Sequence, residues 1–339
     1  MQAKIIMEEV DNMLFNMLNS HRIMVRISIK EEHMKKVLLA TEKAFVKEAV
    51  DKIAALCKEA GYELVKLENY KDPKELIAAV PEADAMIIRS DKVDKAVLDA
   101  AKNLKIVVRA GAGYDNIDTK YAAEKKVVAM NTPGQNSNAV AELAFGMMLY
   151  AARTWFTPKS GTELRGKKLG IHAYGFVGRA LAAIAKGFGM DIYAYDPFID
   201  AAVMAKDGVK AVKTAEELYA TCRYVSLHIP ATEKTKKSIG YELLSKMPKG
   251  ATLVNTARKE VMSEEGLLKM FAERPDFRYL SDVEDAVRDQ ILEKYKDRAF
   301  FTPKKMGAQT EEANINAGIA AARQIIAFFE KGDLTYKVN

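Results

Sequence analysis

Short apolar runs alternate with helical periods along most of the chain. Apolar runs that predict strands lie at 36–40, 63–67, 85–89, 106–109, 168–172, 224–228, 252–255, 279–283 and 299–301. Apolar residues three or four apart predict helices at 45–60, 73–79, 93–102, 138–153, 215–221, 241–246, 263–273 and 311–331. Strands this apolar need cover on both faces, so the alternation predicts parallel sheets with helices on either side.

The helix predicted at 138–153 divides this pattern into two halves. It is rich in Ala, Leu, Phe and Met and carries little charge, so we expect it to be buried on most sides. Such a helix either crosses between domains or packs against a partner subunit. Residues 157–167 are rich in Pro, Ser, Gly and Lys and predict a surface loop that leads into the second sheet. With 339 residues, the chain is long enough for two doubly wound α/β domains with a cleft between them.

Composition narrows the class of protein. The net charge of +6 is modest, and the chain has no basic stripe with interleaved aromatic residues, so we expect no nucleic-acid partner. No apolar run approaches the length of a membrane span. Cys57 and Cys222 lie far apart and neither has a partner at metal-ligand spacing, which indicates two reduced thiols and no metal site. We expect a cytoplasmic protein without a membrane partner.

Residues 1–33 differ from the rest of the chain. They contain several acidic residues, unlike a transit peptide, and no unbroken apolar region, unlike a secretion signal. The first strand follows directly after Met34. We therefore interpret 1–33 as an extension of unclear status that carries no chemistry.

The segment from Lys168 to Asp196 contains a strand, a glycine turn, a helix, a second strand and an acid, in the order of a dinucleotide-binding unit. Gly175 lets the backbone approach a pyrophosphate, and Gly178 lets the helix pack on its strand. A carboxylate at Asp196 binds ribose hydroxyls and repels a 2′-phosphate, which indicates NAD rather than NADP. Ala173 replaces the usual first glycine and fits if its φ is negative. The alternative is a plain glycine turn in an unliganded sheet.

Four further segments follow strands and carry candidate chemistry. Arg258, after the strand 252–255, can clamp a carboxylate through two hydrogen bonds, although an arginine there is often a surface ion pair. The glycine-rich segment 109–116 predicts exposed backbone N–H groups for an anion, or simply a tight turn. Arg89 and Ser90 close the preceding strand, and two lysines lie in the segment 301–307. None of the four histidines is an obvious general base.

Several motifs, in this order along the chain, resemble one known family, the D-isomer-specific 2-hydroxyacid dehydrogenases. They are RAGAGYDNID at 109–118, NTPGQNSNAVAE at 131–142, GKKLGIHAYGFVG at 166–178, LHIPATEKT at 227–235 and NTAR at 255–258. Within the family the chain is most similar to short 3-phosphoglycerate dehydrogenases without a regulatory domain. The resemblance implies a flavodoxin-like substrate domain, 34–134 plus 306–339, and a Rossmann NAD-binding domain, 135–305. It also implies a homodimer that forms around the helix after Asn138.

The resemblance also implies roles for individual residues. Arg258 would bind the substrate carboxylate and C2 oxygen, and Asp282 would face the nicotinamide carboxamide. The substrate side would be lined by Arg89, Ser90, Ala110, Gly111, Ala112, Gly113, Asn136 and Lys304. The cofactor side would be lined by Tyr174, Gly175, Phe176, Val177, Gly178, Asp196, His228, Pro230, Thr235, Thr256 and Asp282, with His228 on the adenine side.

One departure from the family pattern concerns the acid/base. Lys305 stands in the place of the usual histidine, and the glutamate that orients that histidine falls near Val287, which cannot serve. Three acids, Glu284, Asp285 and Asp289, lie nearby in the sequence and leave the orienting acid open. A lysine pKa of about 10.4 must fall for Lys305 to accept a proton at neutral pH. The positive charge of Arg258 and desolvation would both lower it. Our hypothesis is that Lys305 is the acid/base; the alternative is that Lys304 and Lys305 only attract phosphate, while water takes the proton.

We therefore expect an enzyme that oxidises D-3-phosphoglycerate to 3-phosphohydroxypyruvate with NAD, at the entry to serine biosynthesis. The substrate class is a small phosphorylated hydroxy acid. Two alternatives remain from the sequence. One is another D-2-hydroxyacid dehydrogenase, such as a glyoxylate, hydroxypyruvate or lactate reductase. The other is a non-catalytic NAD-sensing protein on the same fold.

Overall fold

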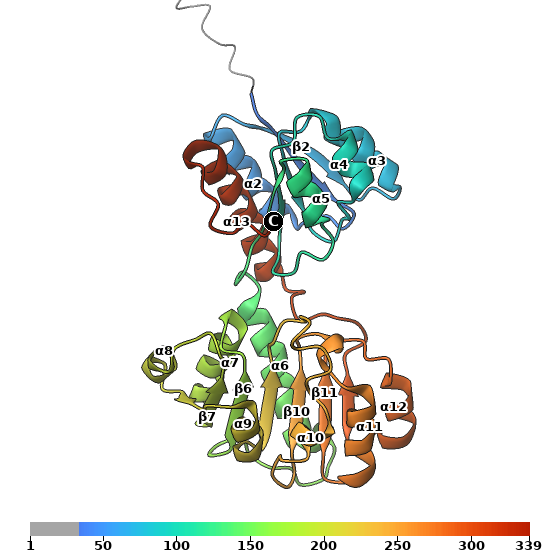
Figure 1. Ribbon diagram of the computed structural model, residues 1–339, viewed down its shortest axis with the longest axis vertical. Coiled ribbons are helices and arrows are strands. Elements are labelled where there is room, and N and C mark those ends of the chain that lie inside the picture. The colour runs from blue at the N-terminus through green and yellow to red at the C-terminus, as the bar shows by residue number, and fades with distance from the viewer. Residues whose placement is uncertain (1–33) are drawn as a thin grey trace, which may run out of the picture.

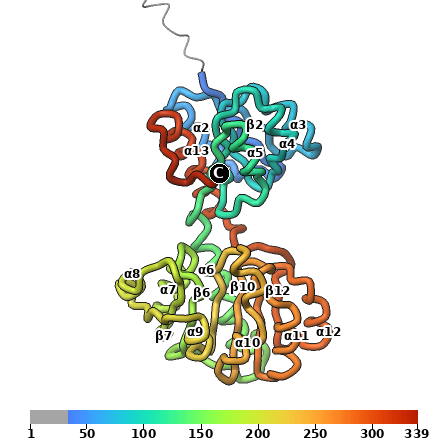
Figure 2. Tube along the Cα trace, in the orientation of Figure 1, coloured from blue at the N-terminus to red at the C-terminus, as the bar shows by residue number. Residues whose placement is uncertain are grey.

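The computed structural model describes residues 34–339 and shows two lobes, each built on one parallel sheet (Figure 1). The extension that we predict at 1–33 lies outside the described residues. Two connections join the lobes: the start of one long helix, and the segment that leads into the last helix (Figure 2). The last residues return to the first lobe, where the Val338 amide donates to the Ala129 carbonyl at 2.9 Å.

The first lobe holds a five-stranded sheet in the order β2-β1-β3-β4-β5. Its strands are β1 Lys36–Thr41, β2 Glu63–Glu68, β3 Ala85–Ile88, β4 Ile106–Arg109 and β5 Val128–Asn131. One face packs against α2 (Lys47–Glu59) and α13 (Glu311–Lys331), and a second apolar cluster joins the other face to α3 (Pro73–Ala79), α4 (Lys95–Ala100) and α5 (Thr119–Glu124). Helix cover on both faces explains why β1, β3 and β4 are apolar and buried almost throughout, whereas the edge strand β2 carries charged residues.

The second lobe holds a seven-stranded sheet in the order β12-β11-β10-β9-β6-β7-β8. Its strands are β6 Lys168–His172, β7 Asp191–Tyr195, β8 Lys210–Ala211, β9 Tyr224–Leu227, β10 Thr252–Asn255, β11 Arg278–Ser281 and β12 Ala299–Phe301. Its helices are α6 Ser137–Ala152, α7 Phe176–Gly187, α8 Ala201–Lys206, α9 Ala215–Thr221, α10 Tyr241–Leu244, α11 Glu264–Glu273 and α12 Arg288–Tyr295. The clusters on its two faces contain α6 with α7, and α9 with α10 and α11.

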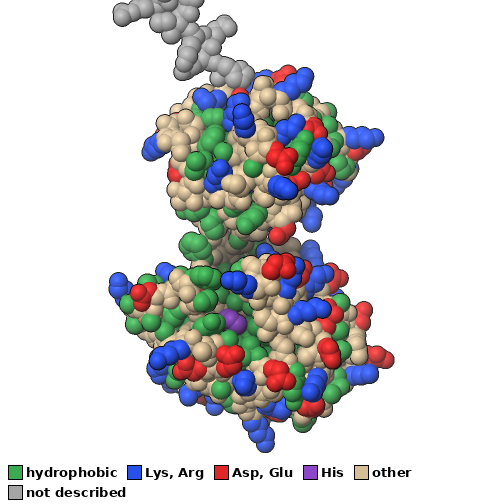
Figure 3. Space-filling model, viewed as in Figure 1, with side chains coloured by type: hydrophobic (Ala, Val, Ile, Leu, Met, Phe, Trp, Pro, Cys, Tyr) green, Lys and Arg blue, Asp and Glu red, His purple; other side chains and the backbone are tan. Residues whose placement is uncertain are grey.

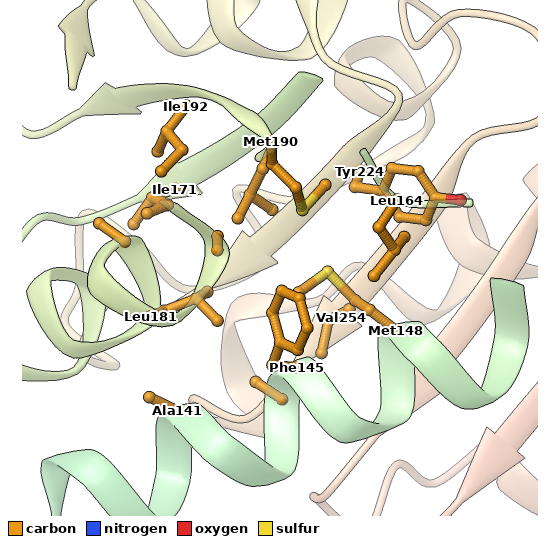
Figure 4. Packing of buried hydrophobic residues seen from close by; sticks show 14 of the residues in the cluster. Ala141, Phe145, Met148, Leu164, Ile171, Leu181, Met190, Ile192, Tyr224 and Val254 are labelled. Carbon is orange, nitrogen blue, oxygen red and sulfur yellow. The ribbon is translucent and has the colours of Figure 1, made fainter. Parts of the chain in front are cut away.

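The packing of helix α6 explains why it is rich in apolar residues. Ala141, Phe145 and Met148 lie on the face that packs against α7 and the sheet, where they meet Leu181 and Ile171 (Figure 4). These side chains are at most 4% exposed. Burial of an aliphatic or aromatic side chain contributes about 1.5–3 kcal/mol, so this face holds the crossing helix firmly on the second lobe.

The strand order locates a ligand site in each lobe. In the second sheet β6 pairs with both β7 and β9, so the strand order reverses between β6 and β9. In the first sheet β1 pairs with both β2 and β3. Ligands of open parallel sheets bind beyond the carboxyl ends of the strands at such a reversal.

The predicted fold class, two doubly wound parallel-sheet domains, is confirmed by the two sheets. The sheets lie on either side of the predicted domain boundaries, and the limits themselves stay predictions. None of the helices within residues 34–339 is long and apolar enough to cross a membrane.

Candidate active site

The turn between β6 and α7 begins the cofactor side of the site. Gly175 caps α7 with no side-chain hydrogen bond, which leaves the first N–H groups of this helix for another acceptor. Those N–H groups belong to Phe176, Val177 and Gly178. A Cβ on Gly178 would lie 2.4 Å from the Ala173 carbonyl oxygen, so only glycine allows this close packing. A helix N-terminus of this kind fits a pyrophosphate.

Ala173 corrects one expectation. We expected a methyl group to fit there if φ stayed negative, but φ is +82°. The positive φ shows that the turn keeps the backbone geometry that glycine usually provides, with alanine accommodated in it. The left-handed region costs a non-glycine residue about 1–2 kcal/mol.

Asp196 lines a cavity of about 1160 Å³. The Tyr174 and Phe198 amides each donate to its carboxylate at 2.8 Å, which fixes the acid beyond the end of β7. The same cavity is lined by His172, Tyr195, Ile229, Pro230 and Thr235. An acid fixed beside an apolar cavity fits the ribose and adenine of NAD.

Two residues predicted on the cofactor side are placed differently. The Tyr174 side chain is fully buried and its hydroxyl donates to Asp207 at 2.8 Å, so only its backbone reaches the turn. His172, not His228, lines the cavity, while His228 lies beside Thr256, with Nδ1 and Oγ1 3.5 Å apart. Burial lowers the pKa of His172 to about 4 and that of His228 to about 3. Both are neutral at pH 7, and neither is placed to act as the base.

Arg258 follows β10 and reaches across to the first lobe. The Asn255 side chain accepts the Ala257 amide at 3.0 Å and donates to the Arg258 carbonyl at 3.2 Å, which shapes the turn. One guanidinium nitrogen lies only 3.2 Å from the position that a Cβ on Gly113 would take. The second-lobe arginine therefore touches the glycine-rich segment of the first lobe, and Figure 3 shows the surface hollowed between the lobes.

The glycine-rich segment corrects a second expectation. We expected Ala110 to Gly113 to expose successive N–H groups, but Ala110 donates to Ile88 and Gly111 to the Arg109 carbonyl. Within residues 34–339, the amides of Ala112 and Gly113 donate to no other backbone group. Two N–H groups thus remain for an anion instead of four.

Arg109 is a site residue that sequence reasoning missed. Gly111 has φ +151°, and a Cβ there would stand 1.7 Å from a guanidinium nitrogen of Arg109, so the side chain folds beneath the glycine. Its Nε donates to the Arg89 carbonyl at 3.0 Å. Burial, followed by the charges of Arg89 and Arg258, lowers the Arg109 pKa. Arg109 is the last residue of β4, and this position at the carboxyl end of a strand could have identified it from the sequence as a candidate site residue.

The remaining residues predicted on the substrate side differ in their burial and hydrogen bonding. Arg89 donates to the Lys43 and Ala44 carbonyls and to the Asn314 side chain in α13, so its guanidinium is tied into the first lobe. Ser90 and Lys304 are exposed, and Asn136 stands at the N-cap of α6 without a capping bond.

Asp282 anchors the loop that carries Lys305. Its carboxylate is 1% exposed and accepts hydrogen bonds from the Thr302 hydroxyl and from the Met306 and Gly307 amides, at 2.8–2.9 Å. We expected Asp282 to face the nicotinamide carboxamide; that role stays a prediction. The structure shows that it also holds the lysine loop on the second lobe.

Lys305 lies among opposed charges. Although much of the side chain is exposed, desolvation of its ammonium group is the largest cause of a lowered pKa, followed by the charge of Arg258. Asp282 and Asp115 oppose this shift, and Arg109 adds to it. Lys305 therefore lies close enough to both arginines for their charges to lower its pKa. The nearby acid Asp285 does not serve Lys305, because it binds Tyr279 and Ser281.

Comparisons with known proteins agree with this geometry. A family profile described as D-isomer specific 2-hydroxyacid dehydrogenase, NAD binding domain, matches residues 134–303. The D-3-phosphoglycerate dehydrogenase of Methanocaldococcus jannaschii is 37% identical over 268 residues, which cover 74% of this chain and 51% of that protein. The chain belongs to the D-isomer-specific 2-hydroxyacid dehydrogenases. The hydroxypyruvate reductase of Thermotoga maritima is 35% identical over 85% of this dehydrogenase chain and 98% of that protein.

A solved structure is also similar to this 2-hydroxyacid dehydrogenase. It is the NAD⁺-bound 3-phosphoglycerate dehydrogenase of Entamoeba histolytica, with 46% identity and a TM-score of 0.81 over 90% of this chain and 99% of that one. The predicted enzyme class and the NAD cofactor are confirmed at the level of the family. The chain spans about half the length of the M. jannaschii relative.

Proposed function

We propose that this dehydrogenase oxidises D-3-phosphoglycerate to 3-phosphohydroxypyruvate. The observation that carries the proposal is the group of cations in the cleft: besides burial, the charge of Arg258 lowers the pKa of Arg109 and of Lys305, and the charge of Arg109 also lowers that of Lys305. Such a group suits a substrate with an anion at each end, because a carboxylate and a phosphate together compensate the like charges. The relatives named D-3-phosphoglycerate dehydrogenase support the same substrate.

The proposed mechanism assigns one task to each residue. When bound, NAD supplies the acceptor for the hydride from C2. Arg258 holds the substrate carboxylate and polarises the C2 oxygen, and Arg109 sits beneath the glycine loop as a counter-charge for the phosphate. Lys305 takes the proton from the C2 hydroxyl during oxidation and returns it during reduction. Its lowered pKa favours the neutral amine that oxidation needs.

A substrate panel tests the proposal. We expect NADH formation with D-3-phosphoglycerate, and a kcat/KM at least ~100-fold higher than with D-glycerate, because loss of the phosphate removes charge-assisted bonds. The reverse reaction should show the same preference for 3-phosphohydroxypyruvate over hydroxypyruvate. Absence of NADH formation at any pH would contradict dehydrogenase activity.

A second candidate substrate comes from the T. maritima relative, a hydroxypyruvate reductase that the chain matches over nearly its whole length. This alternative predicts that hydroxypyruvate is reduced at least as efficiently as its phosphorylated form. The panel therefore separates the two.

We further propose that the protein forms a homodimer through the end of α6. The rings of Tyr150, Trp155 and Phe156 cluster there, with centroids 5.2 Å apart from Tyr150 to each neighbour, and Phe156 is 69% exposed. Tyr150 and Trp155 are half-buried beneath Phe156, and an exposed aromatic side chain packed on other rings is typical of an interface. Light scattering on the purified chain should give twice the monomer mass, and a monomer mass at micromolar concentration would contradict the proposal.

A further inference from the structure

A cluster of buried polar side chains lies under the turn that carries Arg258. Asn255 ends β10, Tyr279 and Ser281 belong to the neighbouring strand β11, and Asp285 follows that strand. Asn255, Tyr279 and Ser281 are fully buried and Asp285 is 4% exposed. Figure 1 shows the two strands side by side in the second lobe. A buried carboxylate away from the cavity needs a reason, because burying charge is costly.

The hydrogen bonds of this cluster form one continuous chain. The Tyr279 hydroxyl donates to Asp285 Oδ2 at 2.9 Å and accepts from Asn255 Nδ2 at 3.2 Å. The same Nδ2 donates to the Arg258 carbonyl, and Asn255 Oδ1 accepts the Ala257 amide. Ser281 adds a second hydroxyl donor to Asp285 at 2.9 Å. These hydrogen bonds therefore connect the Asp285 carboxylate with the Ala257 amide and the Arg258 carbonyl in the turn that carries Arg258.

The direction of these bonds depends on Asp285. A tyrosine hydroxyl has one proton, so when it donates to Asp285 its lone pairs are free to accept from Asn255. Without an acceptor at position 285, the hydroxyl can turn its proton toward the amide, and the Asn255 side chain loses a fixed orientation. The other groups that face Asp285 are Glu264 in α11, which raises its pKa, and Lys259, which lowers it.

We propose that Asp285, acting through Tyr279 and Asn255, is a positioning residue for Arg258. The inference rests on the proposed function, because it assigns a support to the arginine that binds the substrate carboxylate. Loss of the support leaves Arg258 present but less well oriented. Substrate binding should therefore suffer, while NAD binding, which uses the β6–α7 turn, should not.

The test compares four variants in the reduction of 3-phosphohydroxypyruvate by NADH. Tyr279→Phe removes the hydroxyl, and Asp285→Leu removes the acceptor. Asp285→Asn keeps an acceptor oxygen and serves as the conservative rescue. Tyr224→Phe is the matched control, since it removes a hydroxyl from another buried tyrosine of the same sheet that lies outside the cluster. We expect the first two to lower kcat/KM by ~10-fold, the loss of about one hydrogen bond. This loss should appear mainly as a raised KM.

The same reasoning predicts that Asp285→Asn and Tyr224→Phe stay within ~2-fold of the natural protein, and that the dissociation constant of NADH is unchanged in all four. A double-mutant cycle decides whether the effect acts through the arginine. In an Arg258→Ala background, Tyr279→Phe should cause no further loss beyond ~2-fold. If Tyr279→Phe lowered kcat/KM by the same ~10-fold in the Arg258→Ala background as in the natural protein, the inference would be overturned.

The outcomes separate this inference from the function on which it rests. A natural protein that gives no turnover with NADH contradicts the proposed function. An active natural protein with an equally active Tyr279→Phe variant contradicts only the positioning role. If circular dichroism shows Tyr279→Phe to be unfolded, the test is the comparison of Asp285→Leu with Asp285→Asn. Equal kcat/KM values for these two variants would overturn the inference.

Discussion

Lys305 illustrates how one residue can depend on its surroundings for its chemistry. Its ammonium group is desolvated and lies near Arg258, and both effects lower its pKa. We predict that Lys305→Met lowers kcat for oxidation by ~100-fold or more, because it removes the proton acceptor. In the natural protein the oxidation rate should rise with pH as the amine becomes neutral, up to a pKa below that of an ordinary lysine. Stopped-flow measurement of NADH formation against pH checks both.

The control for this variant is Lys304→Met, which removes the neighbouring exposed cation. It should leave the pH dependence of kcat in place. A Lys305→Met protein with near-normal kcat and a raised KM alone would show that the two lysines only attract the phosphate.

Asp285 predicts how stability varies with pH. Burial raises its pKa to about 6 from the ordinary 3.8, so the folded protein binds this proton more tightly than the unfolded chain does. The ionised carboxylate therefore destabilises the fold, and this cost grows as pH rises from about 4 through 6. We expect Asp285→Asn to raise the free energy of unfolding by on the order of 2 kcal/mol at pH 8, and by much less at pH 4. Urea denaturation at the two pH values measures the difference, and an equal effect at both would contradict a buried carboxylate.

Ala173 offers a simple test of backbone strain. At φ +82° an alanine is strained where a glycine is not, so Ala173→Gly should stabilise the protein by about 1 kcal/mol. Ala60→Gly is the matched control, because Ala60 ends α2 with φ −79° and glycine there should give no gain. A lower urea midpoint for Ala173→Gly than for the natural protein would refute the strain argument.

The glycines at the element boundary between β6 and α7 have separable roles. A Cβ at Gly178 would press against the Ala173 carbonyl, whereas a Cβ at Gly175 would meet nothing within 4 Å. We expect Gly178→Ala to lower stability by about 2 kcal/mol, because the helix must move away from its strand. Gly175→Ala should fold normally and bind NAD ~10-fold more weakly, since a methyl group obstructs the approach of the phosphates.

Thermal unfolding and NADH fluorescence titration distinguish the two variants. If Gly175→Ala left the NADH affinity unchanged, the result would show that the pyrophosphate does not bind at this turn.

Elements with a strong apolar pattern were predicted well from the sequence. The strand at 106–109 and the helices at 73–79 and 311–331 have the predicted bounds. The short strands β5 and β8 and the helices α5, α8 and α12 were not predicted. Of the eight residues of α12, only Ile291 is buried, so this helix shows little apolar periodicity.

The position of a candidate residue was predictable where it lies just beyond the end of a strand: Asp196 follows β7 directly, and Arg258 lies in the turn after β10. The roles of both residues stay predictions. The site was not predictable where function depends on neighbouring strands. Whether Tyr279 lies next to Asn255 depends on the pairing of β10 with β11, which no local pattern reveals. The folding of the Arg109 side chain beneath Gly111 is likewise a property of the three-dimensional loop.

At the scale of the whole molecule, the charges of the cleft should make catalysis sensitive to salt. Arg109, Arg258 and Lys305 share one electrostatic environment with Asp115 and Asp282, and the excess of positive charge should attract an anionic substrate. Raising NaCl from 50 mM to 500 mM should therefore lower kcat/KM for phosphoglycerate severalfold, by shortening the range of the attraction. Glyoxylate, with a single charge, is the control and should show a smaller decrease in the reverse reaction. Equal salt dependence for both substrates would contradict a steering role for the cleft.

The bonds of Asp282 have a mechanical consequence. Because this carboxylate ties Met306 and Gly307 to the end of β11, the proposed base Lys305 moves with the lobe that contains the β6–α7 turn. Any rotation of the other lobe must then bend the backbone beyond Gly307 and before the first turn of α6. Under the proposed function, the position of the Lys305 amine relative to NAD is thereby preset, and only the hydroxy acid has to be brought into position.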